Sequence, residues 1–142
     1  MSFKSRIVKG GMVVAMAGTA LMGITTAANA SPSAGNIGAG YTNNTHGVWC
    51  AQHNISYWFR TSGSDHRVPA EDGIFGAETK QAIKDFQEEM GLPQDGVLGP
   101  QTGNALMAHG DPTYTGSDMP YRAGGGTSTC TSYCYTYLPT TW

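Results

Sequence analysis

A pattern that combines a tight turn with a helix start occurs twice in the sequence and constrains the fold most. It reads Asp72-Gly-Ile-Phe-Gly-Ala-Glu-Thr79 and returns as Asp95-Gly-Val-Leu-Gly-Pro-Gln-Thr102. In each copy the glycine after the aspartate can adopt the positive φ that a tight turn requires. The second glycine suits a helix N-cap, and Pro100 suits a first helical residue because that position needs no N–H donor. We therefore expect two turn-helix units, with each aspartate accepting backbone N–H groups near a helix N-terminus.

The run of residues 72–106 resembles the small peptidoglycan-binding domain family. The family pattern D-G-x-F-G-x-x-T-x-x-A-[VI]-x-x-F-Q-x-x-x-G-L-x-x-D-G-x-x-G-x-x-T-x-x-x-L is matched at every fixed position. The resemblance implies a three-helix domain that bacteria and phages use to hold secreted proteins against the cell wall. It also implies the ligand contacts, which we place at polar positions beside the two turns: Asp72, Thr79, Asp95, Gln101 and Thr102.

The first 30 residues are typical of a secretory signal peptide. Lys4, Arg6 and Lys9 precede an uncharged run that ends in Ala28-Asn29-Ala30, which predicts cleavage after Ala30. An uncleaved membrane anchor is the alternative, because the run is nearly long enough to span a bilayer. Cleavage would leave no membrane contact and a mature chain of net charge about −5, which argues against nucleic acid as a partner.

Helical periodicity places an all-α domain at residues 47–110, after a lead-in at 31–46 whose Gly, Ser and Asn content predicts flexibility. We expect a small three-helix bundle with helices at 48–59, 77–90 and from Pro100 onward, and Gly91 as a left-handed C-cap. Gly103 and Asn104 should weaken the third helix. The residues expected to face inward are Val48, Ala51, Ile55, Trp58, Phe59, Ala82, Ile83, Phe86, Met90, Ala105 and Leu106, with Ile74, Phe75, Val97 and Leu98 between the turn glycines.

Residues 111–142 form an irregular tail that carries tyrosines and two of the three cysteines. Alternation of β-branched and aromatic residues at 131–138 predicts a short strand. The tyrosines could stack on sugar rings or cover the small core, and the sequence favours neither.

The three cysteines, Cys50, Cys130 and Cys134, predict a disulfide in a secreted chain. Loop entropy favours a long-range bond from Cys50 to Cys130 or Cys134, whereas a Cys130–Cys134 bond is the alternative. The remaining thiol could link two chains. A zinc site of these cysteines with His46 is disfavoured because no C-x-x-C spacing is present, so we expect no metal and no cofactor.

No set of residues in the sequence is typical of an active site. Cys50 with His46 and His53 lacks a third orienting group, and nothing beside Glu71, Asp72 or Asp95 would raise a carboxylate pKa. We therefore expect a secreted or cell-wall-associated, non-catalytic binder of peptidoglycan, of either its glycan strand or its stem peptide, that localises itself or a partner enzyme. The alternatives are a small secreted cell-wall hydrolase and a pro-domain-like inhibitor of a secreted protease, although the P-R-C-G-type segment of such inhibitors is missing.

Overall fold

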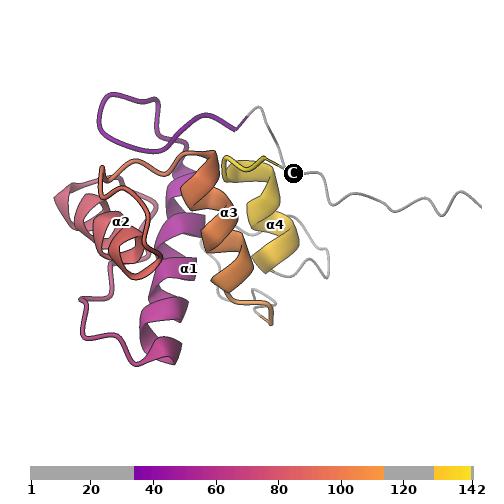
Figure 1. Ribbon diagram of the computed structural model, residues 1–142. Coiled ribbons are helices and arrows are strands. Elements are labelled where there is room, and N and C mark those ends of the chain that lie inside the picture. Colours follow the sequence, from indigo (N-terminus) through magenta and orange to yellow (C-terminus); the bar gives the residue numbers. More distant parts are fainter. Residues whose placement is uncertain (1–33, 114–129, 142) are drawn as a thin grey trace, which may run out of the picture.

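The computed structural model describes residues 34–113 and 130–141, and within them the chain is all-α (Figure 1). Three main helices, α1 (Thr45–Ser62), α2 (Ala77–Glu89) and α3 (Pro100–His109), pack together with a short fourth helix, α4 (Cys130–Tyr137). α1 contacts each of the others. The predicted fold class is confirmed. The predicted signal peptide lies outside the described residues, and no described helix is long and apolar enough to cross a membrane.

The central position of α1 follows from its sequence. Asn44 caps its N-terminus, because the side-chain oxygen accepts the N–H groups of His46 and Gly47. Gly63, with φ of 77°, ends the helix in the left-handed conformation that glycine adopts most easily. All residues from Gly47 to Ser56 are buried, so the helix is covered on every side in its first three turns.

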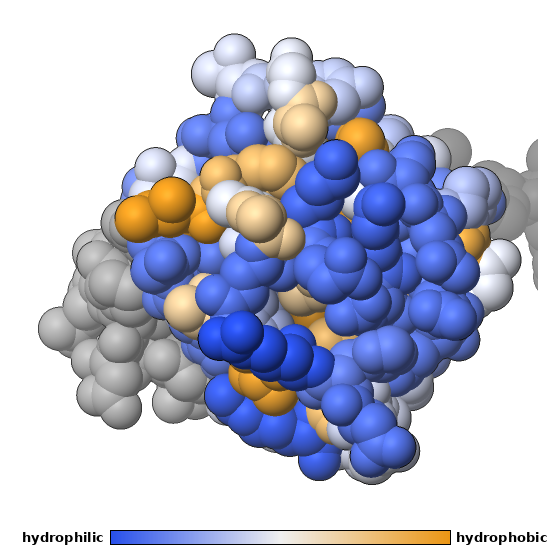
Figure 2. Space-filling model, turned by 90° about the vertical axis from the view of Figure 1, so that its left-hand side faces the viewer, coloured by the Kyte–Doolittle hydropathy of each residue, from blue (hydrophilic) through white to orange (hydrophobic). Residues whose placement is uncertain are grey.

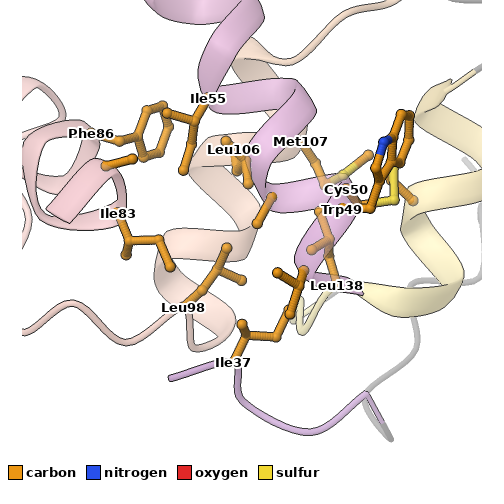
Figure 3. Packing of buried hydrophobic residues seen from close by; sticks show 14 of the residues in the cluster. Ile37, Trp49, Cys50, Ile55, Ile83, Phe86, Leu98, Leu106, Met107 and Leu138 are labelled. Atoms are coloured by element: carbon orange, nitrogen blue, oxygen red, sulfur yellow. A yellow bond between two sulfur atoms is a disulfide. The ribbon is translucent and has the colours of Figure 1, made fainter. Parts of the chain in front are cut away.

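The core surrounds α1 (Figure 3). Ile83 and Phe86 of α2 lie on one side of it, and Leu106 of α3 packs between the helices. Most of the residues predicted to face inward are buried, whereas Trp58, Met90 and Ala105 are partly buried at the edge. The opposite side of α2 carries its charged residues, and Figure 2 shows a mostly hydrophilic surface on this side of the molecule, with apolar residues gathered mainly in the upper left of the view.

The two turn-helix units bury different residues, which the sequence did not predict. Leu98 is fully buried, but its counterpart Phe75 is only partly buried, and Ile74 is 66% exposed. The difference arises because the second unit has a partner segment. Ile37 pairs with Leu98 through two backbone hydrogen bonds of 3.1 and 2.8 Å, and its side chain is 1% exposed. Residues 34–44, part of the segment predicted to be a flexible lead-in, therefore pack on the domain.

The tail is joined to the core by a disulfide between Cys50 and Cys134, whose Cα atoms are 5.5 Å apart. The preferred long-range pairing is thereby confirmed, and the Cys130–Cys134 alternative is wrong. The predicted strand at 131–138 is also wrong, since α4 occupies it. Helical spacing places Cys134 and Leu138 toward α1 and lets Tyr133 and Tyr137 both contact His46, and this packing outweighs β-propensity.

The helix-weakening residues of α3 are the place where the C-terminus docks. A Cβ on Gly103 would lie 1.7 Å from the carbonyl oxygen of Pro139, so only glycine admits this approach. The next residue, Asn104, accepts a hydrogen bond from the Thr141 N–H at 2.9 Å and donates one to the Thr141 hydroxyl at 2.6 Å. The loss of helix propensity is thus offset by tertiary contacts.

We expect Gly103→Ala to lower the free energy of unfolding by about 2 kcal/mol, because the new methyl group overpacks the contact with Pro139. In a free helix the same substitution would stabilise by about 1 kcal/mol. Urea denaturation of the full chain measures the net effect of the substitution. The same measurement on a chain that ends at Leu138 gives the helix-propensity effect without the contact with Pro139. The substitution should become neutral or stabilising in the shortened chain, and stabilisation in the full chain would contradict the analysis.

Candidate functional site

The first turn is organised by a buried glutamine of α1. Gln52 is 1% exposed, and its side-chain NH2 donates to Oδ1 of Asp72 at 2.8 Å and to Oγ1 of Thr79 at 2.9 Å. It also lies 3.2 Å from the Ile74 carbonyl oxygen. Its own oxygen accepts the Gly73 N–H at 2.8 Å. A single carboxamide therefore joins the turn, the start of α2 and the middle of α1.

The second turn repeats this network with a glutamine of α2. Gln87, also 1% exposed, donates to Oδ1 of Asp95 at 2.8 Å, to the Val97 carbonyl at 2.9 Å and to Oγ1 of Thr102 at 3.1 Å. Its oxygen accepts the Gly96 N–H at 3.0 Å. The sequence repeat is therefore also a repeat of hydrogen bonds, with one glutamine, one aspartate, one glycine and one threonine in each copy.

The sequence analysis did not assign a role to either glutamine. The signal that could have found them is a glutamine on the apolar face of the helix that precedes each turn, since such a side chain is buried only when its carboxamide is satisfied. The aspartates also act differently from expectation. Their Oδ1 atoms accept the N–H groups of Ile74 and Val97 inside the turns, at 2.9 Å in both cases. The N-caps of α2 and α3 are instead Gly76 and Gly99, and neither helix has a side-chain cap.

The five predicted contact residues divide between two equivalent hollows beside the turns. Asp72 and Thr79 line the first, of about 260 Å³, at the start of α2. Asp95, Gln101 and Thr102 line the second, of about 230 Å³, at the start of α3. The threonines are buried in the glutamine networks, so the exposed members of the set are the two aspartates and Gln101. Their contact with a ligand stays a prediction.

The two hollows differ in their walls. The first is formed by the turn-helix unit together with Gln52 of α1. The second has an additional wall from the N-terminal segment, which contributes Asn36 and Tyr41. Tyr41 is 47% exposed and is, with Ile74, one of the two large hydrophobic residues exposed in the described part of the chain.

Two neighbouring carboxylates are held in their ionised forms. The pKa of Asp72 is lowered by the backbone hydrogen bond from Ile74 and by the hydrogen bond from Gln52. Burial alone would raise the pKa of Glu71, but the hydrogen bond from His53, at 2.8 Å, and the charges of His53 and Arg60 lower it overall. Neither group has the raised pKa of a general acid.

The disulfide argues against the two alternative roles of Cys50, as a nucleophile and as a zinc ligand. Cys50 is fully buried and disulfide-bonded, so it cannot serve as a nucleophile. The same bond removes two of the three thiolates that a Cys3His zinc site would need. His46 instead stacks on Tyr137, with ring centroids 4.9 Å apart, and its Nδ1 atom forms a hydrogen bond with the Tyr133 hydroxyl.

Comparison with known families agrees with the sequence pattern. The family model described as "Putative peptidoglycan binding domain" matches residues 56–106. The chain therefore contains a domain of this family, which includes both turn-helix units and the end of α1. The match omits residues 34–44, the first half of α1 and α4. No curated protein and no solved structure matches the chain.

We expect Gln52→Glu to destabilise the protein by about 3 kcal/mol, because it replaces an NH2 donor with a second carboxylate facing Asp72 in a buried site. Gln81→Glu is the matched control. Gln81 also donates to an aspartate, Asp85, at 2.7 Å, but it does so on the exposed face of α2. The control should change the free energy of unfolding by less than about 0.5 kcal/mol. Equal effects in urea denaturation would contradict a structural role for Gln52.

The lowered pKa of Asp72 predicts a pH-dependent contribution to stability. Because an aspartate in the unfolded chain has a pKa of about 3.9, the contribution is fully present above that pH and is lost as the pH falls through the lower folded pKa. Asp72→Asn keeps the acceptor in the turn but does not titrate. The stability difference between wild type and Asp72→Asn should therefore shrink on acidification, as measured by urea denaturation between pH 7 and pH 2. A difference that grows at low pH would contradict this sign.

Proposed function

We propose that this protein is a secreted, non-catalytic binder of peptidoglycan. The observation that carries the proposal is the family match over residues 56–106 with both turn-helix units intact. Export is supported by the signal-like segment at residues 1–30 and by the Cys50–Cys134 disulfide, because disulfides persist mainly in oxidising compartments. Its place of action would be the cell wall or the space outside the cell.

A binding role without catalysis is supported by the state of the carboxylates. Cleavage of a glycosidic bond requires one carboxylic acid with a raised pKa beside a second carboxylate. Asp72 has a lowered pKa, and Glu78, the other acidic residue of the first hollow, forms an ion pair with Arg67 at 3.0 Å. Among the described residues that line the second hollow, Asp95 is the one acidic residue, so a pair of carboxylates is not found there.

Binding would use surfaces that the fold already holds in place. The glutamine networks fix both turns, so the exposed groups of Asp72 and Asp95 require little ordering when a ligand arrives. With no covalent step, the protein would localise itself, or an enzyme bound to it, at the wall.

Sedimentation with purified, insoluble murein sacculi tests the proposal. Oxidised protein of residues 31–142 should pellet with the sacculi while the turbidity of the suspension stays constant. A secreted protein of similar size and negative charge serves as the control for trapping and should remain in solution.

Three results would overturn the proposal. Protein that remains in the supernatant would remove the binding role, and clearing of the suspension would make it a hydrolase. Inhibition of secreted proteases without pelleting would favour the inhibitor alternative.

A further inference from the structure

The N-terminal segment gives the second hollow an aromatic wall that lies outside the family match. Residues 34–44 precede the matched region at 56–106, yet Asn36 and Tyr41 line this hollow together with Asp95 and Gln101. Burial of Ile37 explains why residues 34–44 pack on the domain. It does not explain why a tyrosine stands 47% exposed at the rim.

Hydrogen bonds hold the backbone of the loop that carries Tyr41. Asn43 accepts the Gly38 N–H at 2.8 Å and donates to the carbonyl oxygens of Gly38 and Tyr41 at 3.1 and 3.3 Å. The Tyr41 N–H donates to the Gly38 carbonyl at 3.2 Å, which closes a turn. Gly38 lets the Tyr41 ring and Val97 both pack close to its backbone, because a Cβ added there would lie 3.4 Å from Tyr41 and 3.1 Å from Val97. The aromatic face is thus placed before a ligand binds.

Asn36 is placed by the same segment above the start of α3. A Cβ on Gly99 would lie 3.6 Å from the Asn36 side-chain oxygen, which positions this carboxamide over the N-cap of the helix. Gln101 is exposed in the first turn of α3 and lines the same hollow. One aromatic ring and two carboxamides, besides that of the buried Gln87, therefore line a hollow of about 230 Å³.

We propose that this hollow binds an amino-sugar unit of the glycan strand, with Tyr41 packing on the face of the sugar ring and Asn36 and Gln101 bonding its hydroxyl and acetamido groups. The inference rests on the proposed function and names which part of peptidoglycan is recognised. A sugar ring presents an apolar face of C–H groups and polar edges, which matches an exposed aromatic ring beside neutral donors and acceptors.

The charges of the hollow favour the neutral glycan over the carboxylates of the stem peptide. A stem peptide carries ionised carboxylates, for which arginine or lysine is the usual partner. Among the described residues that line the hollow, Asp95 is the charged one, and its Oδ1 already accepts hydrogen bonds from Gln87 and Val97. Among the described residues that line the first hollow none is aromatic, and Glu78 lies beside Asp72, so this hollow offers no equivalent sugar platform.

Binding of Tyr41→Ala to murein sacculi tests the proposal, with affinity taken from sedimentation at increasing sacculus concentration. The variant should bind about five- to tenfold more weakly than wild type, because it loses the stacking face. Tyr57→Ala is the matched control, since Tyr57 lies on α1 and lines neither hollow, and it should bind within about twofold of wild type. Thermal melts establish that each variant is folded, and Gln101→Ala supplies a second variant at an exposed helical position.

Competition distinguishes the two parts of peptidoglycan. Soluble oligomers of N-acetylglucosamine should displace the wild-type protein from sacculi, and a synthetic stem peptide should not. Displacement by the peptide alone, or full binding by folded Tyr41→Ala and Gln101→Ala, would overturn the glycan assignment while wild-type pelleting still supports the proposed function. Loss of binding in Ile74→Ala with no loss in Tyr41→Ala would assign the ligand to the first hollow. Failure of the wild-type protein to pellet would instead overturn the proposed function itself.

Discussion

Two buried carboxamides determine how this small domain is assembled. Gln52 and Gln87 are each 1% exposed, and each satisfies a turn glycine N–H, an aspartate and a threonine at once. An unsatisfied polar group in such a site costs about 1–3 kcal/mol, a large part of the stability of a domain of this size. Because Gln52 ties α1 to the start of α2 and Gln87 ties α2 to the start of α3, the two side chains set the relative positions of all three main helices. The first hollow lies against the Gln52 network, and the second lies against the Gln87 network.

The remaining surface of α1 is closed by parts of the chain outside the family match. Ile37 from the N-terminal segment and Leu138 after α4 complete the core, and the disulfide at Cys50 joins α4 to α1. Close approach is possible because Gly47 and Gly103 leave room for the backbone oxygens of Tyr137 and Pro139. A small domain buries a low fraction of its surface, so such additions and a covalent link contribute much to its stability.

The sequence predicted the parts of the structure that depend on local rules. Backbone sterics and helical periodicity account for the D-G turns, the starts of α2 and α3, most of the inward residues and the left-handed φ of Gly91, although the C-cap itself is Met90. The sequence did not predict the contacts between segments that are far apart in the chain. The burial of Ile37, the helix at α4 and the docking of Thr141 on Asn104 depend on contacts between residues far apart in sequence. The sequence placed the candidate contact residues beside the two turns, and the structure has a hollow at each turn. The glutamines behind the turns and the Tyr41 wall required the three-dimensional arrangement.

The position of the disulfide has a consequence for the integrity of the molecule. Cys50 and Cys134 are 84 residues apart and span the connection between α3 and α4. If a protease cut the backbone within that connection, the product would be two polypeptides that remain covalently joined through sulfur, with the shorter one still seated on α1. Cleavage and detachment would therefore be separate events, and detachment would require a reductant.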